Sequence, residues 1–398
     1  AKRCQRLGRG FNSLLPLHYF HVLLIMNAGF NRISQTILVL VLTFFLFLIL
    51  DLFFGKNLTN FLFADNKPVI SHPVYHHDLD KNLNKFQLYN NVFKYRLCTN
   101  EYGFKSNCDV KNKQSKFINY AFIGDSFTEG VGLNYEDTFV GKFAKKKNSK
   151  VVVNLGVASY SPKIYYKKIH YLLNQGFVFE RIIIFIDVGD IYDENQYELI
   201  DNKSIKKKSN IETLNFIYQD YSNLYKAKKI LKAYLPISYL SYIKIINLKN
   251  SIANSNKGSD AVSQKDNLLI NSRWTYENRF SKKDSKWIKK GIDESKYYFD
   301  KIFELGKTYD FKISLAVYPW PAQILYDDNT GKEKIENLWK LYCKNRCEYF
   351  INYIDDFHKI KQKTNKNQIV KLYYFKNDVH FNKFGNDFLF NKLIKIFN

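Results

Sequence analysis

Proline and glycine are scarce in this chain, and their scarcity excludes several architectures. The 398 residues include only 7 prolines and 17 glycines, which excludes collagen-like and low-complexity sequences. Aromatic residues make up 17% and hydrophobic residues 46% of the chain, a composition too apolar for an intrinsically disordered protein. The length allows one large domain with appendages, or two domains.

Arginine is also scarce, which changes the interpretation of the strong positive charge. The formal net charge is +24, yet only 9 of the 61 basic residues are arginine. The lysines are spread along the chain, and no arginine-rich segment typical of nucleic-acid binding occurs. We therefore expect solvated surface lysines and no nucleic-acid partner. Attraction to an anionic glycan or a membrane surface is the alternative.

Methionine occurs once, at Met26, and the first residue is Ala1. A natural start at Met26 would make residues 1–25 an artefact of gene calling, so this stretch is excluded from fold prediction. Within it, the apolar run of residues 14–25 is too short to span a bilayer and contains Pro16.

Only one hydrophobic run is long enough to cross a membrane. The 18 residues 33–50 carry no charge, and residues 52–54 extend the run past Asp51. We predict one uncleaved transmembrane anchor over residues 33–54. A cleaved signal peptide is the alternative, but no small-x-small cleavage site follows. Residues 1–35 contain five basic residues and no acidic one, so we expect residues 1–32 in the cytoplasm and everything after about residue 55 outside, in the periplasm.

Four of the five cysteines lie in two close pairs, which fits an oxidising compartment. Cys98 and Cys108 form one candidate disulfide. Cys343 and Cys347 form the other, which needs a helix that ends there because a regular helix would strain the bridge. Neither pair has a histidine at zinc-finger spacing, so we expect no metal site at the cysteines.

Apolar runs alternate with helical spacing after residue 116, which predicts a three-layer α/β domain with a mainly parallel sheet of about five strands. A lead-in segment, residues 55–116, precedes this domain of residues 117–398. A helical and loop insertion is expected at 195–284, with a lid helix near 230–246 and a mobile loop near 250–268. The predicted strands are 117–123, 151–155, 181–186, 313–317 and 370–375. The predicted helices are one from Pro162 onward, 286–305, 333–342 and 382–397.

Polar residues follow the predicted strands, at the edge where sites of parallel sheets lie. Gly124-Asp125-Ser126 follows the first strand and residues 154–159 follow the second. Residues 187–190 follow the third, and residues 378–382 follow the last. A serine, main-chain donors near a glycine and an Asp/His pair on one edge are typical of nucleophilic catalysis.

Three of these segments resemble a known superfamily. The sequences FIGDSFTEG, VVNLGVASYSP and DVHFNKFGN are similar to blocks one, two and five of the SGNH (GDSL-like) hydrolases. TNEYGFKS and VYPWP resemble a membrane-anchored bacterial branch linked to cell-surface polysaccharide modification. The resemblance covers about residues 95–398.

The resemblance implies a flavodoxin-like fold and an esterase or O-acyltransferase that moves acyl groups, in the first place acetyl, on an extracytoplasmic glycan. It implies no cofactor, and a membrane-bound O-acyltransferase as a partner. Ser126 would be the nucleophile, His380 the base and Asp378 the residue that orients it. The main-chain N–H groups of Ser126 and Gly156 would form the oxyanion hole. The candidate substrate pocket comprises Asp125, Asn154, Gly189, Asp190 and Trp320.

One block departs from the superfamily pattern. Val188-Gly189-Asp190 stands where the superfamily usually has Gly-Asn-Asp, so Gly189 replaces a side-chain oxyanion donor. Loss of one such donor costs about 3–4 kcal/mol of transition-state stabilisation. We therefore expect Gly189→Asn to restore a donor. The alternative is a non-catalytic member that binds glycan or scaffolds an acylation complex.

Several of these residues have simpler interpretations. Ser126 could cap a helix, His380 could cap the last helix, and Trp320 could pack instead of lining a pocket. Asp187, Asp190, Asp193 and Glu194 are interpreted as an acidic surface loop in preference to a cation site. His76-His77-Asp78 is a weak metal candidate because it lies in one loop with no further ligand.

Overall fold

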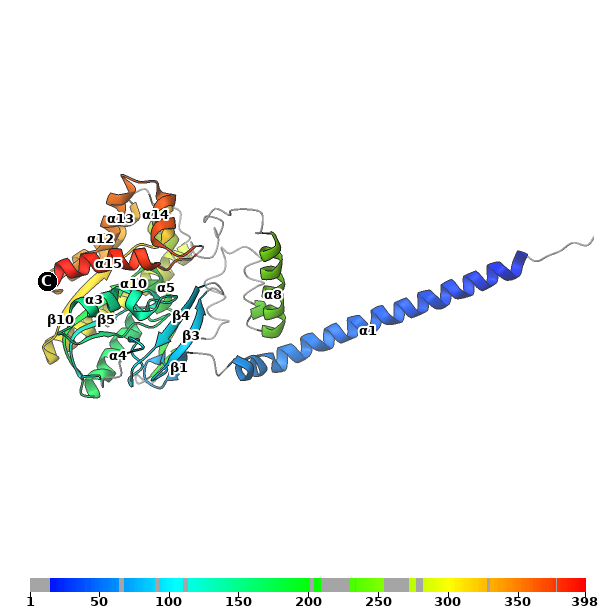
Figure 1. Ribbon diagram of the computed structural model, residues 1–398, viewed down its shortest axis with the longest axis horizontal. Helices are drawn as coiled ribbons and strands as arrows, with labels where there is room; N and C mark the ends of the chain where they lie inside the picture. The colour runs from blue at the N-terminus through cyan, green and yellow to red at the C-terminus, as the bar shows by residue number, and fades with distance from the viewer. Residues whose placement is uncertain are drawn as a thin grey trace, which may run out of the picture. The chain divides into compact units, whose positions relative to one another are not determined.

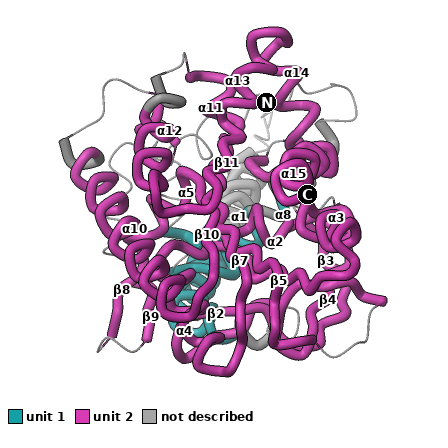
Figure 2. Tube along the Cα trace, turned by 90° about the vertical axis from the view of Figure 1, so that its left-hand side faces the viewer, with its two compact units in different colours: residues 1–65, 222–256 teal, residues 66–221, 257–398 magenta. Residues whose placement is uncertain are grey.

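The computed structural model describes residues 15–63, 68–89, 93–109, 114–200, 204–208, 230–232, 234–253, 272–276, 282–327, 330–376 and 378–398. The chain forms two compact units (Figure 2). Unit 1 comprises residues 1–65 and 222–256, and unit 2 comprises residues 66–221 and 257–398. The middle of the predicted insertion therefore belongs with the N-terminal segment and not with the sheet domain.

Unit 1 is built on the helix α1 (Leu15–Phe63) (Figure 1). Its segment Ser34–Leu58 is long and apolar enough to cross a membrane, and within the described part of the chain it is the only such segment. The predicted anchor of residues 33–54 falls almost wholly within it. The second helix of unit 1 is α8 (Pro236–Ala253), which contacts α1 and covers the stretch where a lid helix was expected.

Unit 2 contains a five-stranded parallel sheet with the order β11-β10-β7-β5-β6. Its strands are β5 (Phe117–Ile123), β6 (Val152–Asn154), β7 (Val178–Ile186), β10 (Lys312–Val317) and β11 (Phe350–Asn352). The central strands are apolar runs that are buried over most of their length, as expected for strands covered on both faces. The prediction of a mainly parallel sheet of about five strands is confirmed.

Helices cover both faces of the sheet. Figure 2 shows α10 (Lys282–Tyr309) on one side of the strands and α3 (Phe139–Lys146) and α15 (Lys383–Ile396) on the other. α4 (Pro162–Asn174) packs against α10, and α15 packs against α3. Among its described residues, unit 2 has eight further helical segments: α2 (Ser126–Glu129), η2 (Tyr135–Asp137), α5 (Val188–Glu194), α9 (Arg273–Tyr276), α11 (Pro321–Tyr326), α12 (Thr330–Cys343), α13 (Tyr353–Lys361) and α14 (Lys366–Tyr373).

The prediction of a strand over residues 370–375 is wrong, because most of this stretch belongs to α14. The side chain of Asn365 accepts a hydrogen bond from the N–H of Asn367 at 2.9 Å, which caps the helix start. The apolar residues of the stretch 370–375 are typical of a strand, but the stretch is mostly helical, and only Ile369 is buried within α14. The fifth strand is instead β11, whose three residues are too few to show a period.

The lead-in segment folds onto the sheet as two antiparallel hairpins, β1 (Val69–His72) with β2 (His76–Leu79) and β3 (Asn84–Tyr89) with β4 (Phe93–Cys98). Beyond the hairpins, buried Lys105 donates from Nζ to the carbonyl oxygens of Gly130 and Leu133 at 2.8 and 2.9 Å. Burial lowers the pKa of Lys105 to about 8. From residue 68 on, the lead-in segment is therefore an integral part of unit 2, whereas its first residues, 55–63, belong to α1 in unit 1.

The candidate metal ligands His76, His77 and Asp78 serve in this packing. Nε2 of His77 lies 2.8 Å from the carbonyl oxygen of Ala158, and Asp78 forms a buried ion pair with Lys168 at 2.8 Å. Burial lowers the pKa of His77 to about 4. A neutral histidine bonded to a carbonyl and a paired aspartate are structural groups here.

The insertion also contains a hairpin of β8 (Tyr197–Ile200) and β9 (Ser204–Lys207) that its composition did not predict. The loop expected near 250–268 lies mostly outside the described residues. Disulfides join Cys98 to Cys108 and Cys343 to Cys347, with Cα–Cα distances of 5.2 and 5.0 Å. α12 ends at Cys343.

Candidate active site

Ser126 is positioned by a tight connection between β5 and α2. Asp125 precedes α2 and accepts a hydrogen bond from the N–H of Phe127 at 2.9 Å, which starts the helix at Ser126. Gly124 leaves no room for a side chain, because an added Cβ would lie 2.9 Å from the carbonyl oxygen of Phe185. Gly130, at φ 72°, then ends the helix in the left-handed conformation that glycine tolerates.

The structure brings Ser126, His380 and Asp378 together. Oγ of Ser126 lies 2.7 Å from Nε2 of His380, and Nδ1 of His380 lies 2.5 Å from Oδ1 of Asp378. The same carboxylate oxygen accepts the main-chain N–H of His380 at 2.8 Å. The side chains of His380 and Asp378 are 15% and 10% exposed, so the group is sheltered but reachable.

A loop after α14, and not a strand end, carries the Asp/His pair. The N–H of Phe375 donates to the carbonyl oxygen of His380 at 3.0 Å, and an isolated bridge pairs Tyr374 with Phe381. These contacts close the loop and place His380 next to α2, where the centroid of its ring lies 4.7 Å from that of Phe127. The sequence predicted that Asp378 and His380 follow a strand at this edge of the sheet. In the structure they follow the helix α14 instead.

Tyr89, from the lead-in hairpin, completes the group and was missed in the sequence. Its hydroxyl donates to Oδ2 of Asp378 at 2.8 Å and lies 2.6 Å from Nδ1 of His380. Gly132 accommodates its ring, since a Cβ there would lie 2.8 Å from Cδ1 of Tyr89. No sequence motif indicates a role for Tyr89, because it lies outside the blocks that carry the superfamily resemblance.

The hydrogen-bond pattern defines what His380 can do chemically. Nδ1 faces the Asp378 carboxylate, which can only accept when ionised, so Nδ1 carries the proton. Nε2 is then the acceptor that faces the Ser126 hydroxyl. The alternative acceptor, Oδ2 of Asp125, lies 3.3 Å from Ser126 Oγ, and the shorter contact to His380 is the stronger one.

Gly156 and Asn154 lie beside α2, at the end of β6. An added Cβ at Gly156 would lie 2.7 Å from the main-chain nitrogen of Glu129, so only glycine fits. The N–H of Gly156 donates to Oδ1 of Asn154 at 3.0 Å, while Nδ2 of Asn154 donates to the carbonyl oxygen of Thr128 at 2.7 Å. Buried Asn154 thus ties β6 to the helix that carries the serine.

Gly189 faces Trp320 at close range. An added Cβ at Gly189 would lie 2.6 Å from Cζ2 of Trp320 and 3.0 Å from Oδ1 of Asp187. Nε1 of Trp320 donates to Oδ2 of Asp187 at 2.6 Å, which holds the indole in place. An asparagine at position 189 would therefore have to displace the indole before its side chain could act as a donor, which argues against the expectation that Gly189→Asn simply restores one.

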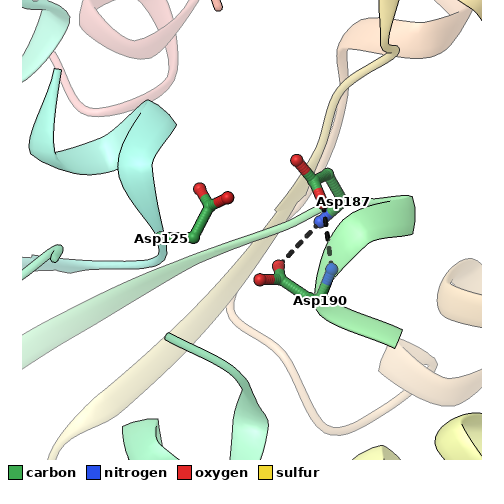
Figure 3. Close-up of side chains that lie close together, drawn as sticks. All are labelled: Asp125, Asp187 and Asp190. Atoms are coloured by element: carbon green, nitrogen blue, oxygen red, sulfur yellow. Dashed lines mark hydrogen bonds between the residues drawn. The ribbon is translucent and has the colours of Figure 1, made fainter. Parts of the chain in front are cut away.

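Three carboxyl groups, among them that of Asp125 just before Ser126, lie close together (Figure 3). One ligand atom each of Asp125, Asp187 and Asp190 lies within 4.8 Å of the others, and all three residues are buried. Burial raises the pKa of each carboxyl group, and the charge of Asp187 raises it further at Asp125 and Asp190.

The cluster has the donor geometry of a metal site, but hydrogen-bond donors already serve its oxygens. Asp187 accepts from Trp320 and from the N–H groups of Gly189 and Asp190. Asp190 accepts from Tyr165 and from the N–H of Asp187, and Asp125 accepts from Tyr318. A cation would have to displace these donors, so the cluster is explained by hydrogen bonding and protonation.

The interpretation of residues 187–194 as an acidic surface loop is wrong. Asp187 and Asp190 form a reciprocal capping box at the start of the helix α5. Buried Glu194 accepts the N–H of Lys163 at 2.9 Å and pairs with its ammonium at 3.2 Å. Asp187, Asp190 and Glu194 are therefore buried groups that hold the start of α5 and its contact with Lys163, and not surface charges.

No protein-family model matches the chain, and no curated protein matches it. Two solved structures are similar over 70% of the chain, each at 11% sequence identity. One is a member of the lipolytic protein G-D-S-L family from Veillonella parvula, of which 98% is covered at a TM-score of 0.37. The other is the psychrotrophic esterase EstA from Pseudoalteromonas sp., inhibited by monoethylphosphonate, of which 96% is covered at a TM-score of 0.32.

Proposed function

We propose that this chain is a serine esterase or O-acyltransferase with Ser126 as nucleophile, His380 as base and Asp378 as its partner. One observation carries the proposal. Ser126 Oγ, His380 Nε2, His380 Nδ1 and Asp378 Oδ1 form a continuous chain with contacts of 2.7 and 2.5 Å. A serine hydroxyl, an imidazole and a carboxylate in this order are the parts of an acyl-transfer site.

The first step is attack of Ser126 on an ester carbonyl. The hydroxyl proton moves to Nε2 of His380 as the bond between Oγ and the carbonyl carbon forms. The imidazolium that results is stabilised by Asp378 on its other side. The negative charge on the carbonyl oxygen is assigned to the N–H groups of Ser126 and Gly156, and Gly156 must then exchange its bond to Asn154 for the oxyanion.

The second step releases the alcohol and then the acyl group. His380 returns its proton to the leaving oxygen, which leaves an acyl-Ser126. An incoming hydroxyl then loses its proton to His380 and attacks the acyl carbon, so that the serine is regenerated. Water as the acceptor gives hydrolysis and a sugar hydroxyl gives transfer, with the same residues in both cases.

We assign the reaction to acetyl or other O-acyl groups on an extracytoplasmic glycan. Support comes from the resemblance of TNEYGFKS and VYPWP, from the basic residues before Ser34–Leu58 and from two disulfides. The same resemblance supports a membrane-bound O-acyltransferase as partner. An alkaline phosphatase fusion after Lys116 tests the orientation, because an inactive reporter would contradict it.

A fluorophosphonate probe tests the chemistry directly. The full chain should be labelled, and Ser126→Ala should abolish labelling because the probe bonds to the activated Oγ. The matched control is Ser115→Ala, at the opposite end of β5, which should label as the original chain does. Ser126→Ala and His380→Ala should each remove nearly all turnover of p-nitrophenyl acetate, and the double variant should lose little more.

A non-catalytic, glycan-binding role is the second candidate, and the packing of Trp320 against Gly189 favours it. In this role the site would hold an O-acylated sugar without cleaving it. The two candidates differ in one result. A folded chain that binds acetylated glycan but takes no probe at any concentration would establish the binder and end the esterase proposal.

A further inference from the structure

Asp51 stands inside the apolar segment Ser34–Leu58 and is 1% exposed. Its partners lie at the start of α8, almost two hundred residues further along the chain. Its Oδ1 accepts the N–H of Ile237 at 3.0 Å, and its Oδ2 accepts the N–H and the hydroxyl of Ser238 at 2.7 and 2.6 Å. The carboxylate of one helix thus caps the first turn of another.

Gly55 lies one helical turn after Asp51 and lets α8 approach α1 closely. A Cβ at Gly55 would lie 2.0 Å from Oδ1 of Asp51 and 3.2 Å from Cγ of Pro236. A small residue at the contact between two helices is typical of packing between membrane helices. Both α1 and α8 belong to unit 1, so this contact lies within one compact unit.

The described part of α8 and the residues just before it expose large apolar side chains. Leu240 is 42% and Ile245 is 66% exposed, and Ile230 and Tyr234 are also exposed. α8 contains no acidic residue, and its sequence includes tyrosines and lysines among the apolar residues. Tyrosine is enriched where helices meet the membrane–water interface, and a lysine among apolar residues can extend its ammonium group to that interface.

We propose that α8 is a second membrane contact, seated in the bilayer interface against α1 and held there by Asp51. If Ser34–Leu58 crosses the bilayer, the start of α8 lies at the depth of Asp51. The seven residues from Asp51 to Leu58 rise about 10 Å along a helix. Exposed apolar side chains at this depth would meet acyl chains and headgroups, so lipid is the occupant that this depth and these side chains fit.

The proposal also explains an acidic residue in an apolar span. A carboxylate in a membrane segment is costly unless it has polar partners. The N–H groups at a helix start are such partners, because they have no acceptor within their own helix. The inference does not depend on the esterase activity.

Nitroxide labelling of the full chain tests the proposal. In a Cys4→Ser background the remaining cysteines are paired, so Leu240→Cys and Ile245→Cys can be labelled singly in vesicles of phosphatidylcholine and phosphatidylglycerol. Collisions with oxygen report lipid, and collisions with a water-soluble nickel chelate report solvent. Phe45→Cys, 57% exposed on α1, and Tyr297→Cys, 53% exposed on α10 in unit 2, are the lipid and water controls.

Both α8 labels should resemble Phe45→Cys, with oxygen collisions exceeding nickel collisions. Labels that resemble Tyr297→Cys would overturn the proposal. Low access to both reagents would also overturn it, because protein and not lipid would then cover the helix. Asp51→Ala and Gly55→Leu should each shift the α8 labels toward nickel access and leave the label at Phe45→Cys unchanged. Labels that remain in lipid in both variants would contradict the role of Asp51.

Discussion

The hydroxyl of Tyr89 donates a hydrogen bond to Asp378 at 2.8 Å and lies 2.6 Å from Nδ1 of His380. A phenol has one proton, so its oxygen is left to accept the Nδ1–H of His380. Tyr89 and Asp378 therefore favour the same tautomer, with Nε2 free of a proton and facing Ser126. A residue of the lead-in segment thus sets the protonation pattern of the site.

Tyr89→Phe should lower kcat/KM about ten- to a hundredfold, because a hydrogen bond to a charged group contributes about 1.5–3 kcal/mol. The ring contacts with Phe375 and Gly132 remain in this variant. The measurement is turnover of p-nitrophenyl acetate by folded protein. Tyr342→Phe, which removes a phenol that bonds Asp300 on a distant helix, is the matched control. Equal activities of the two variants would remove Tyr89 from the mechanism.

Asp378→Asn should reduce kcat/KM less than Ser126→Ala does. The neutral amide no longer stabilises the imidazolium, but the Tyr89 oxygen can still accept the Nδ1–H. The double variant Asp378→Asn with Tyr89→Phe should therefore fall below either single variant. Additive free energies in this cycle would show that the two residues act separately, against the shared role described above.

Gly189→Asn should destabilise the protein by about 1–3 kcal/mol, as overpacking of a buried site does, and should not raise turnover. The new Cβ would lie 2.6 Å from Cζ2 of Trp320. Urea unfolding measures the loss. Gly189→Ala adds the same Cβ and should also destabilise the protein. This loss of unfolding free energy should be smaller in a Trp320→Phe background, which lacks Cζ2, than in the original chain. An undiminished cost would place the clash elsewhere.

Asp190→Asn should change how stability depends on pH. Burial raises the pKa of Asp190 well above its ordinary value of 3.8, so above that pH the unfolded chain releases a proton that the folded chain keeps. The free energy of unfolding of the original chain therefore falls as pH rises from about 4 toward the folded pKa. Relative to the variant, the original chain should lose stability over this range.

The control for this comparison is Asp293→Asn, on the exposed face of α10. Its free energy of unfolding should run parallel to that of the original chain at each pH. If the free energy of unfolding of Asp190→Asn also ran parallel to that of the original chain, the carboxyl group of Asp190 would ionise in the folded protein as it does in the unfolded chain.

Long apolar strands were predictable from the sequence, and short or covered elements were not. The seven residues of β5 and residues 181–186 of β7 form apolar runs long enough for hydrophobicity to predict them, whereas the start of β7 was not predicted. β11 has three residues, and α14 resembles a strand because Val370, Leu372 and Tyr373 at its end are followed by two more aromatic residues. In both cases tertiary contacts decide the outcome and local preference does not.

The candidate site was predictable where a motif is local. Ser126 and the pair Asp378 and His380 stand in short recognisable segments, and the structure brings them to one place. Tyr89 and the contact of Gly189 with Trp320 depend on parts of the chain that meet only after folding. No pattern within a window of ten or twenty residues contains that information.

The distances along the chain between the residues of the site have a kinetic consequence. Ser126 and His380 are 254 positions apart, and Tyr89 and His380 are 291 apart. Closing loops of this length costs entropy that only a largely assembled protein can offset. The strands from Phe117 to Asn352 leave the ribosome before Asp378 does, so a nascent chain can form its sheet while it still lacks Asp378 and His380. The contacts of Ser126 with His380 can then form only when assembly is nearly finished, so the proposed chemistry would be the last property that the folding chain acquires.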